Sequence, residues 1–216
     1  MQPIWQLLLG ILVGDFLVAA GHWFEDQYFD QHTPHIGTVG RDNVFHHYLP
    51  YAMTSFSPLE HTKITLPLTL ASLALLYLVA PGFILKYPYM ITVICLITVS
   101  SNALHSIQHE RPCRQPSWFR VLSNLGILES SAQHKRHHLD PQHRYGVVLG
   151  WTNPIYDGLG VWRILELLVP LPKRSKPSYT ELEQKLPDDI RTLVNQPCPH
   201  HIPKERIQSL RKHVLS

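Results

Sequence analysis

The sequence has few charged residues and few cysteines, and each shortage excludes a class of protein. Asp, Glu, Lys and Arg make up 16% of the 216 residues, whereas a typical soluble chain has roughly 25%, so a disordered chain and a coiled coil are excluded. A net charge of +3 is too small for the basic surface of a nucleic-acid-binding protein. The three cysteines, Cys95, Cys113 and Cys198, form no C-x-x-C pair and are odd in number. Neither a disulfide scaffold nor a zinc ribbon is indicated.

Motifs of several common enzyme classes are also absent. The zinc-protease motif H-E-x-x-H fails at residues 109–113, where Cys113 stands in place of the second His and Pro112 would break the helix. Neither G-x-S-x-G nor the Walker A motif occurs. Residues 158–160 begin a Gly-x-Gly pattern, but Arg163 stands where the last glycine of a dinucleotide-binding loop belongs. Nucleotide-binding and serine-hydrolase functions are therefore excluded.

Three long apolar runs dominate the first half of the chain. Residues 1–21 contain one charge, Asp15, and residues 64–85 and 87–104 contain none. Each run is long enough to cross a hydrocarbon core of about 30 Å at about 1.5 Å per residue. We therefore predict an all-α integral membrane bundle of three spanning helices, with Lys86 at a tight turn between the second and the third. The alternatives are buried helices of a soluble protein and, for residues 1–20, a cleaved signal peptide, which the internal Asp15 disfavours.

The remaining segments predict the orientation and the domain division. Sixteen of the nineteen Lys and Arg residues lie from Arg111 onward, so the positive-inside rule places the C-terminal part and the loop of residues 22–63 in the cytoplasm. Amphipathic spacing predicts two interfacial helices, one at residues 118–128 with Ser117 as its N-cap and one at residues 155–169. We divide the chain into a membrane domain, residues 1–170, and a polar cytoplasmic tail, residues 171–216.

Fifteen histidines are several times the usual number, and many of them are grouped at helical spacing. His105 and His109 are four residues apart, and the group at 134, 137 and 138 has i, i+3 and i+4 spacing, so helices would present these imidazoles on one side. This is how helices deliver nitrogen ligands to metals. The predicted metal ligands are His22, Asp26, His46, His47, His105, His109, His134, His137 and His138. Many imidazoles without paired thiolates suit iron, zinc, copper or nickel, and eight or more suggest two ions.

Asp15 is a carboxylate within an apolar run, where it costs on the order of 2.5–3.5 kcal/mol and usually faces a functional interior. In a helix it lies on the same face as His22 and Asp26. We predict that Asp15 orients a ligand histidine through its other ring nitrogen, in which case Asp15→Asn would lower metal occupancy or activity by roughly 10–100-fold. The alternative is that Asp15 is solvated because the helix is tilted or short.

Several blocks of the sequence, spread from about residue 10 to about residue 168, together resemble the Kua family. That family comprises plasmanylethanolamine desaturases and the related plant plastidial acyl-lipid desaturases. The matching blocks are Asp15-Phe16, Gly21-His22-Trp23 with Asp26, Phe45-His46-His47 with Pro50, His105-x3-His109, His134-x2-His137-His138, Tyr145, Gly150-Trp151-x-Asn153, Trp162-Arg163 and Glu166. Gln133 departs from the family pattern because the last block often begins with a His there, which leaves the ligand role to His134. His61 and His143 are further candidate ligands, the first requiring an insertion and the second lying one position off the family's His.

The resemblance implies an oxidoreductase that uses O2, a di-iron centre of two Fe ions, and two electrons from cytochrome b5 or a similar carrier. Its substrate would be a membrane phospholipid, and the expected reaction converts the 1-O-alkyl chain of plasmanylethanolamine to the vinyl ether of a plasmalogen. The first alternative is desaturation of an acyl chain near its ester carbonyl. A non-catalytic His-rich metal transporter or scaffold is the alternative of another class. The expected location is the endoplasmic reticulum in a eukaryote or the inner membrane in a bacterium, with the histidines facing the cytoplasm.

Overall fold

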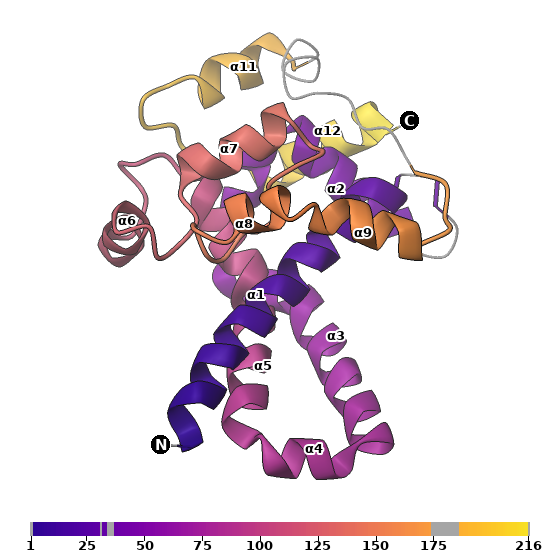
Figure 1. The fold of residues 1–216 in the computed structure, drawn as a ribbon. Helices are drawn as coiled ribbons and strands as arrows, with labels where there is room; N and C mark the ends of the chain where they lie inside the picture. The colour runs from indigo at the N-terminus through magenta and orange to yellow at the C-terminus, as the bar shows by residue number, and fades with distance from the viewer. Residues whose placement is uncertain (1, 31, 34–36, 174–185, 216) are drawn as a thin grey trace.

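A computed structural model describes residues 2–30, 32–33, 37–173 and 186–215, and these ranges are almost entirely helices and loops (Figure 1). They contain no β-strand, and an isolated β-bridge joins Leu128 to Leu149. The predicted all-α fold class is confirmed. The molecule has two parts, a group of long helices at one end and a cap of short helices at the other (Figure 1).

The long helices are α1 (Gln2–Tyr28), α3 (Pro58–Val79) and α5 (Pro88–His109). Each is long and apolar enough to cross a membrane, which confirms the three predicted spans. The second span begins earlier than predicted because Ser57 and Glu60 form a capping box that starts α3 at Pro58. A short helix, α4 (Pro81–Lys86), lies where we predicted a tight turn.

The three spans do not form a closely packed bundle. Both α1 and α3 pack along α5, and Figure 1 shows α3 leaning away from the other two toward α4. None of the most apolar part of α3 is buried within the protein, and large apolar side chains such as Leu68, Leu75 and Leu78 are exposed. These surfaces match a lipid environment.

The cap lies at the opposite end of the spans from α4 (Figure 1). It consists of α2 (Gly37–Tyr48), η1 (Pro50–Ser55), α6 (Ser117–Asn124), α7 (Ser131–Leu139), α8 (Asn153–Gly158), α9 (Val161–Leu168), α11 (Asp188–Val194) and α12 (Lys204–Leu215). Segments far apart in the chain meet there, so the cap brings together the side chains that the spans alone would leave separate.

Two details of the predicted interfacial helices are wrong. Helix α6 has Pro116 as its N-cap and begins at Ser117, and it ends at Asn124, before residue 128. Residues 155–169 do not form one helix, because Gly160 adopts a left-handed conformation with φ of 63° and separates α8 from α9. Gly126, with φ of 71°, similarly follows the end of α6.

The C-terminal segment, which we expected to be a polar tail, is part of the folded cap where the structure describes it. Six of its apolar side chains are buried against α2 and η1: Leu186, Ile190, Val194, Ile202, Ile207 and Leu210. Their partners include Phe45, Leu49 and Tyr51. Residues 174–185 of the expected tail lie outside the described residues, and the domain boundary at residue 170 stays a prediction.

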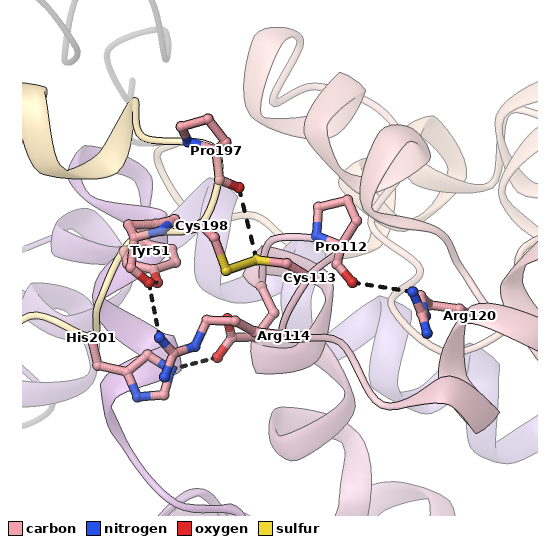
Figure 2. Close-up of a disulfide and its surroundings, with 10 residues drawn as sticks. Tyr51, Pro112, Cys113, Arg114, Arg120, Pro197, Cys198 and His201 are labelled. Carbon is pink, nitrogen blue, oxygen red and sulfur yellow. Dashed lines mark hydrogen bonds and ion pairs between the residues drawn. A yellow bond between two sulfur atoms is a disulfide. The ribbon is translucent and has the colours of Figure 1, made fainter.

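A disulfide between Cys113 and Cys198 fastens this segment to the loop that follows α5 (Figure 2). Around it, the Arg114 guanidinium and the Tyr51 hydroxyl each donate a hydrogen bond to the Pro199 carbonyl, at 3.0 Å. Arg111 donates to the Val194 carbonyl. The count of three cysteines did not indicate this bond because Cys95, the third, lies unpaired in α5.

Replacing Cys198 by Ser is expected to lower the thermal stability of the purified protein under non-reducing conditions. The disulfide closes a loop with a sequence separation of 85 residues, and cross-links of this kind contribute about 2–4 kcal/mol, chiefly by restricting the unfolded chain. Thermal unfolding in detergent micelles measures the effect. Cys95→Ser is the matched control and should unfold at the wild-type temperature. Equal unfolding temperatures for wild type and Cys198→Ser would show that the cross-link contributes nothing.

Candidate metal centre

Nine buried or half-buried side chains with ligand atoms converge where the spans meet the cap. They form two groups, and within each group the ligand atoms lie within 4.8 Å of one another. We define site A as His46, His105, His109, His134 and His138, and site B as His22, Asp26, His47 and His137. The structure therefore brings together all nine residues predicted as metal ligands, which come from α1, α2, α5 and α7.

In site A the Nε2 atoms of the histidines point at one another. The Nε2 of His134 lies 2.8 Å from that of His105, 3.2 Å from that of His109 and 3.1 Å from that of His138. Nitrogen ligands about 2.0–2.1 Å from one metal ion are themselves about 3 Å apart, so this spacing fits coordination of a common cation. His46 supports the same conclusion, because it is buried and neither of its ring nitrogens has a hydrogen-bond partner in the described part of the chain.

In site B a carboxylate lies among three histidines. The Nε2 atoms of His47 and His137 each lie 3.0 Å from an oxygen of Asp26, and that of His22 lies 3.6 Å away. The opposite ring nitrogens of two of these histidines are also held, since Nδ1 of His22 donates to the Tyr145 carbonyl at 2.9 Å and Nδ1 of His137 donates to the backbone carbonyl of His143 at 2.7 Å. These bonds fix the tautomer that leaves Nε2 available to a metal.

Three histidines of site A, His46, His134 and His138, lie outside the spans. Burial favours the neutral form of their imidazoles, which is the form that binds metals. Loss of water contact lowers the pKa of His46, His134 and His138 well below the usual range, and neighbouring histidines lower each pKa further. Metal ligation needs the unprotonated nitrogen, so no proton has to be displaced near neutral pH.

Gln133, the residue that departs from the family pattern, helps to position helix α7. Ser130 and Gln133 form a capping box at the start of α7, and the Gln133 side chain also donates to the Gly150 carbonyl at 2.9 Å. Gln133 thus holds the helix that carries His134, His137 and His138, and takes no part in either ligand group.

The predicted role of Asp15 is wrong. Among the residues that the structure describes, its carboxylate has no histidine partner, and it accepts hydrogen bonds from the Leu149 amide and the Tyr156 hydroxyl, both at 2.9 Å. Asp15 is fully buried and therefore anchors the loop between Tyr145 and Asn153 to α1. Within this loop the Asn153 side chain both accepts from the Gly146 amide and donates to its carbonyl, at 2.7 and 3.0 Å.

The two further candidate ligands lie outside both sites. His61 is near the start of α3, and its Nε2 donates to the Met53 carbonyl at 3.0 Å. His143 is exposed, and its Nδ1 lies 2.9 Å from the Asp140 carboxylate. Only the backbone carbonyl of His143 takes part in the centre, by accepting the hydrogen bond from His137.

Sequence reasoning missed Glu129, a fully buried carboxyl next to the loop that Asp15 anchors. Burial raises the pKa of this carboxyl, the Asn153 side chain lowers it and the nearby Asp15 raises it, and the resulting pKa is about 8. The sequence places Glu129 directly before the Ser130 capping box, outside any apolar run, so no local signal marked it as buried.

An apolar cavity of about 1090 Å³ connects the spans to both sites. It is lined by residues of α1, α3 and α5, and at the cap end by His22 of site B and by His46 and His105 of site A. A hydrocarbon chain lying between the spans would thus reach both groups of ligands without entering water.

The fold and the two ligand groups define the class of the protein, an integral membrane helical protein with histidine-rich sites that could hold two metal ions. A model of the lipid desaturase domain family matches residues 11–179, and the chain belongs to that family. It is a lipid desaturase, an oxidoreductase of membranes. No solved structure matches the chain.

The curated relatives are desaturases from distant organisms. A protein of Acanthamoeba polyphaga mimivirus named a probable fatty acid desaturase is 29% identical over 87% of this chain and 94% of its own length. The chloroplastic fatty acid desaturase 4-like 2 of Arabidopsis thaliana is 27% identical over 84% of this chain and 65% of its own length. Plasmanylethanolamine desaturase 1 of Mus musculus is 28% identical over 82% of this chain and 68% of its own length.

Asp15→Asn is expected to destabilise the protein, and Tyr156→Phe should recover part of the loss. An amide offers one acceptor oxygen where the carboxylate offers two, so one of the donors at Leu149 and Tyr156 loses its partner, at a cost of about 1–3 kcal/mol. Thermal unfolding of the two single variants and the double variant forms a double-mutant cycle. Strictly additive losses would contradict a shared hydrogen-bonding role.

Glu129→Gln is expected to stabilise the protein increasingly as the pH rises from about 5 to 8. The pKa of the buried carboxyl is raised to about 8, so between that value and the ordinary pKa of an unfolded glutamate the folded state keeps a proton that the unfolded state has released. Wild-type stability therefore falls with pH by about 1.4 kcal/mol per pH unit for this one proton, and levels off above pH 8. Unfolding temperatures across this range measure it, and parallel curves for wild type and variant would refute it.

Proposed function

We propose that the chain desaturates the 1-O-alkyl chain of plasmanylethanolamine to the vinyl ether of a plasmalogen, using O2 and two iron ions. The observation that carries the proposal is the cavity that runs from the membrane helices to both ligand groups. The candidate ligands are eight histidines and one carboxylate, which suit iron ions. An iron–sulfur cluster would need thiolate ligands and a calcium ion would need mainly oxygen ligands.

The division of work between metal and protein follows from the geometry. Two bound iron ions would supply oxidation by O2: two hydrogens leave adjacent chain carbons, and with two electrons and two protons the O2 is reduced to two waters. The site A histidines and the four site B residues would hold the ions. The Tyr145 carbonyl orients His22 and the His143 carbonyl orients His137. The apolar walls of the cavity position the chain and exclude water from the reacting carbons.

The choice of substrate has support on two sides. The mouse relative is named as a plasmanylethanolamine desaturase, and this name favours the alkyl chain. The viral and plant relatives are named as fatty acid desaturases, and they favour the alternative, desaturation of an acyl chain near its ester carbonyl. Cytochrome b5 or a similar carrier is the proposed electron donor.

We further propose a multi-pass location in the endoplasmic reticulum of a eukaryote or the inner membrane of a bacterium. The Lys and Arg distribution favours a cytoplasmic cap, whereas a disulfide such as Cys113–Cys198 is typical of an oxidising compartment. The redox state of this cysteine pair in intact membranes distinguishes the two orientations, since a cytoplasmic cap should hold it reduced.

His105→Ala and His138→Ala are each expected to abolish desaturation while the protein still inserts and accumulates. Each substitution removes one site A nitrogen and leaves the lipid-facing surface of the spans unchanged. The measurements are iron content of the purified chain and vinyl-ether formation in cells that lack plasmalogens, before and after expression. His143→Ala is the matched control, because its exposed side chain lies outside both sites.

Two irons per wild-type chain with new vinyl ethers would support the proposal in full. New acyl double bonds without vinyl ethers would show that the substrate is the alternative one, an acyl chain. Wild-type turnover by either site A variant, or stoichiometric zinc without redox activity, would contradict the di-iron assignment.

A further inference from the structure

The lining of the cavity that reaches sites A and B changes from apolar to polar along its length. Between the spans its walls are hydrocarbon, and they include Leu17, Leu68, Leu73, Leu76 and Ile94. At the cap end the polar lining residues are Glu25, Asp42, Asn43, Glu60, Lys63, Gln208 and Arg211. Two of its carboxylates are neutralised, since Glu60 pairs with Lys204 and Asp42 pairs with Arg211. A ligand that fills the whole cavity therefore needs an apolar chain and a polar, charged end.

The apolar part is long enough for one hydrocarbon chain of a bilayer leaflet. On α5 the lining extends from His105 to Ile91, which is about 21 Å along the helix at about 1.5 Å per residue. Half of a hydrocarbon core of about 30 Å is about 15 Å. A chain with its end toward α4 would place its polar end at the cap, beside the histidines.

Asn43 offers an unused hydrogen-bond donor at this polar end. Its side chain is only 7% exposed, and its Nδ2 atom is buried with no hydrogen-bond partner among the residues that the structure describes. It lies in α2, three residues before His46. A buried donor without an acceptor destabilises a fold, so its retention indicates an acceptor on a ligand.

Two cations, Lys63 and Arg211, are among the lining residues. Lys63 forms no ion pair or hydrogen bond with any residue in the described ranges, although Glu60, one turn earlier, is paired with Lys204. Arg211 contacts the Asp42 carboxylate through Nη1 at 2.9 Å, and its buried Nε has no hydrogen-bond partner in the described chain. Both side chains therefore have N–H groups that could donate hydrogen bonds to an anion.

Helix α12 lies beside this end of the cavity and is anchored by two ion pairs seven residues apart. Near its start, Lys204 contacts the Glu60 carboxylate of α3 at 2.6 and 2.8 Å. Seven residues later, Arg211 contacts Asp42 of α2. Between them Ile207 and Gln208 line the cavity. The C-terminal helix is therefore a wall of the cavity, and the two ion pairs connect it to the span α3 and to the cap helix α2.

We propose that Asn43, Lys63 and Arg211 bind the glycerophosphate group of a membrane phospholipid whose hydrocarbon chain lies between α1, α3 and α5. The inference rests on the proposed lipid desaturation and assigns the residues that would hold the phosphate of its phospholipid substrate. Binding at these three residues brings the carbons nearest the glycerol close to His46 and His105, which is where an alkyl-ether or near-carbonyl double bond forms.

Binding of two short-chain probes to the purified protein tests the proposal without turnover. Dioctanoyl glycerophosphate and dioctanoylglycerol differ only in the phosphate, and ligand-induced shifts of the unfolding temperature report their affinities. We expect Lys63→Gln and Arg211→Gln each to weaken binding of the phosphate probe by roughly 10-fold or more, and to leave the neutral probe unaffected. Arg211→Lys should retain much of the affinity.

The matched controls lie on α12 itself. Lys212→Gln removes an exposed charge next to Arg211, and Arg206→Gln removes a cation that pairs with Asp189 outside the cavity. Both should bind the phosphate probe as the wild type does. Equal weakening by the controls would mean that the overall charge of α12 governs binding, and would overturn the proposal. Lys63→Gln decides the matter alone if Arg211→Gln fails to fold.

Asn43→Ala separates a ligand-binding role from a structural one. If the Nδ2 donor is reserved for lipid, the variant should be at least as stable as wild type without lipid and should bind the phosphate probe more weakly. A less stable variant with unchanged affinity would remove Asn43 from the site. Equal affinity of the wild type for both probes would overturn the proposal as a whole. A protein that prefers the phosphate probe but desaturates no lipid would refute the proposed function and leave this site standing.

Discussion

The arrangement of this protein depends on holding eight imidazoles and one carboxylate together in a buried place at the edge of the membrane. Nitrogen lone pairs about 3 Å apart repel one another unless a cation or a shared proton lies between them, so the fold must fix these side chains from several directions. Four helices share the task. The capping box of α7, the carbonyls of Tyr145 and His143, and the bonds of the loop after α7 all keep the rings in place.

The three buried carboxyl groups, Asp15, Asp26 and Glu129, differ in the partners that surround them. Asp26 lies among the histidines of site B, and Asp15 accepts two hydrogen bonds that attach the loop of residues 145–153 to the first span. Glu129 is instead stable mainly as the neutral acid, because burial raises its pKa to about 8. Only Asp26 belongs to a ligand group, and of the other two it is Asp15 that stabilises the neighbouring loop through its hydrogen bonds.

The spans are loosely packed, whereas the cap is tightly packed. Because α3 leans away from α1, the spans leave space for a lipid chain, and little protein contact stabilises that region. The cap compensates with an apolar core formed by α2, η1, α11 and α12 and with the Cys113–Cys198 cross-link. The C-terminal segment therefore stabilises the part of the molecule that carries the ligands of α2.

The sequence by itself determined the three spans and predicted the nine candidate ligands that the fold brings together, because hydropathy and helical spacing are properties of contiguous residues. It also predicted that α5 and α7 present their histidines on one side. Tertiary structure alone decided how the nine candidate ligands divide into sites A and B, that Asp15 accepts hydrogen bonds from Leu149 and Tyr156, and that Cys113 pairs with Cys198. It also buried Glu129 and packed the C-terminal helices onto α2. Each of these facts joins residues far apart in the chain, and no local pattern encodes which distant partner a buried polar or apolar group will meet.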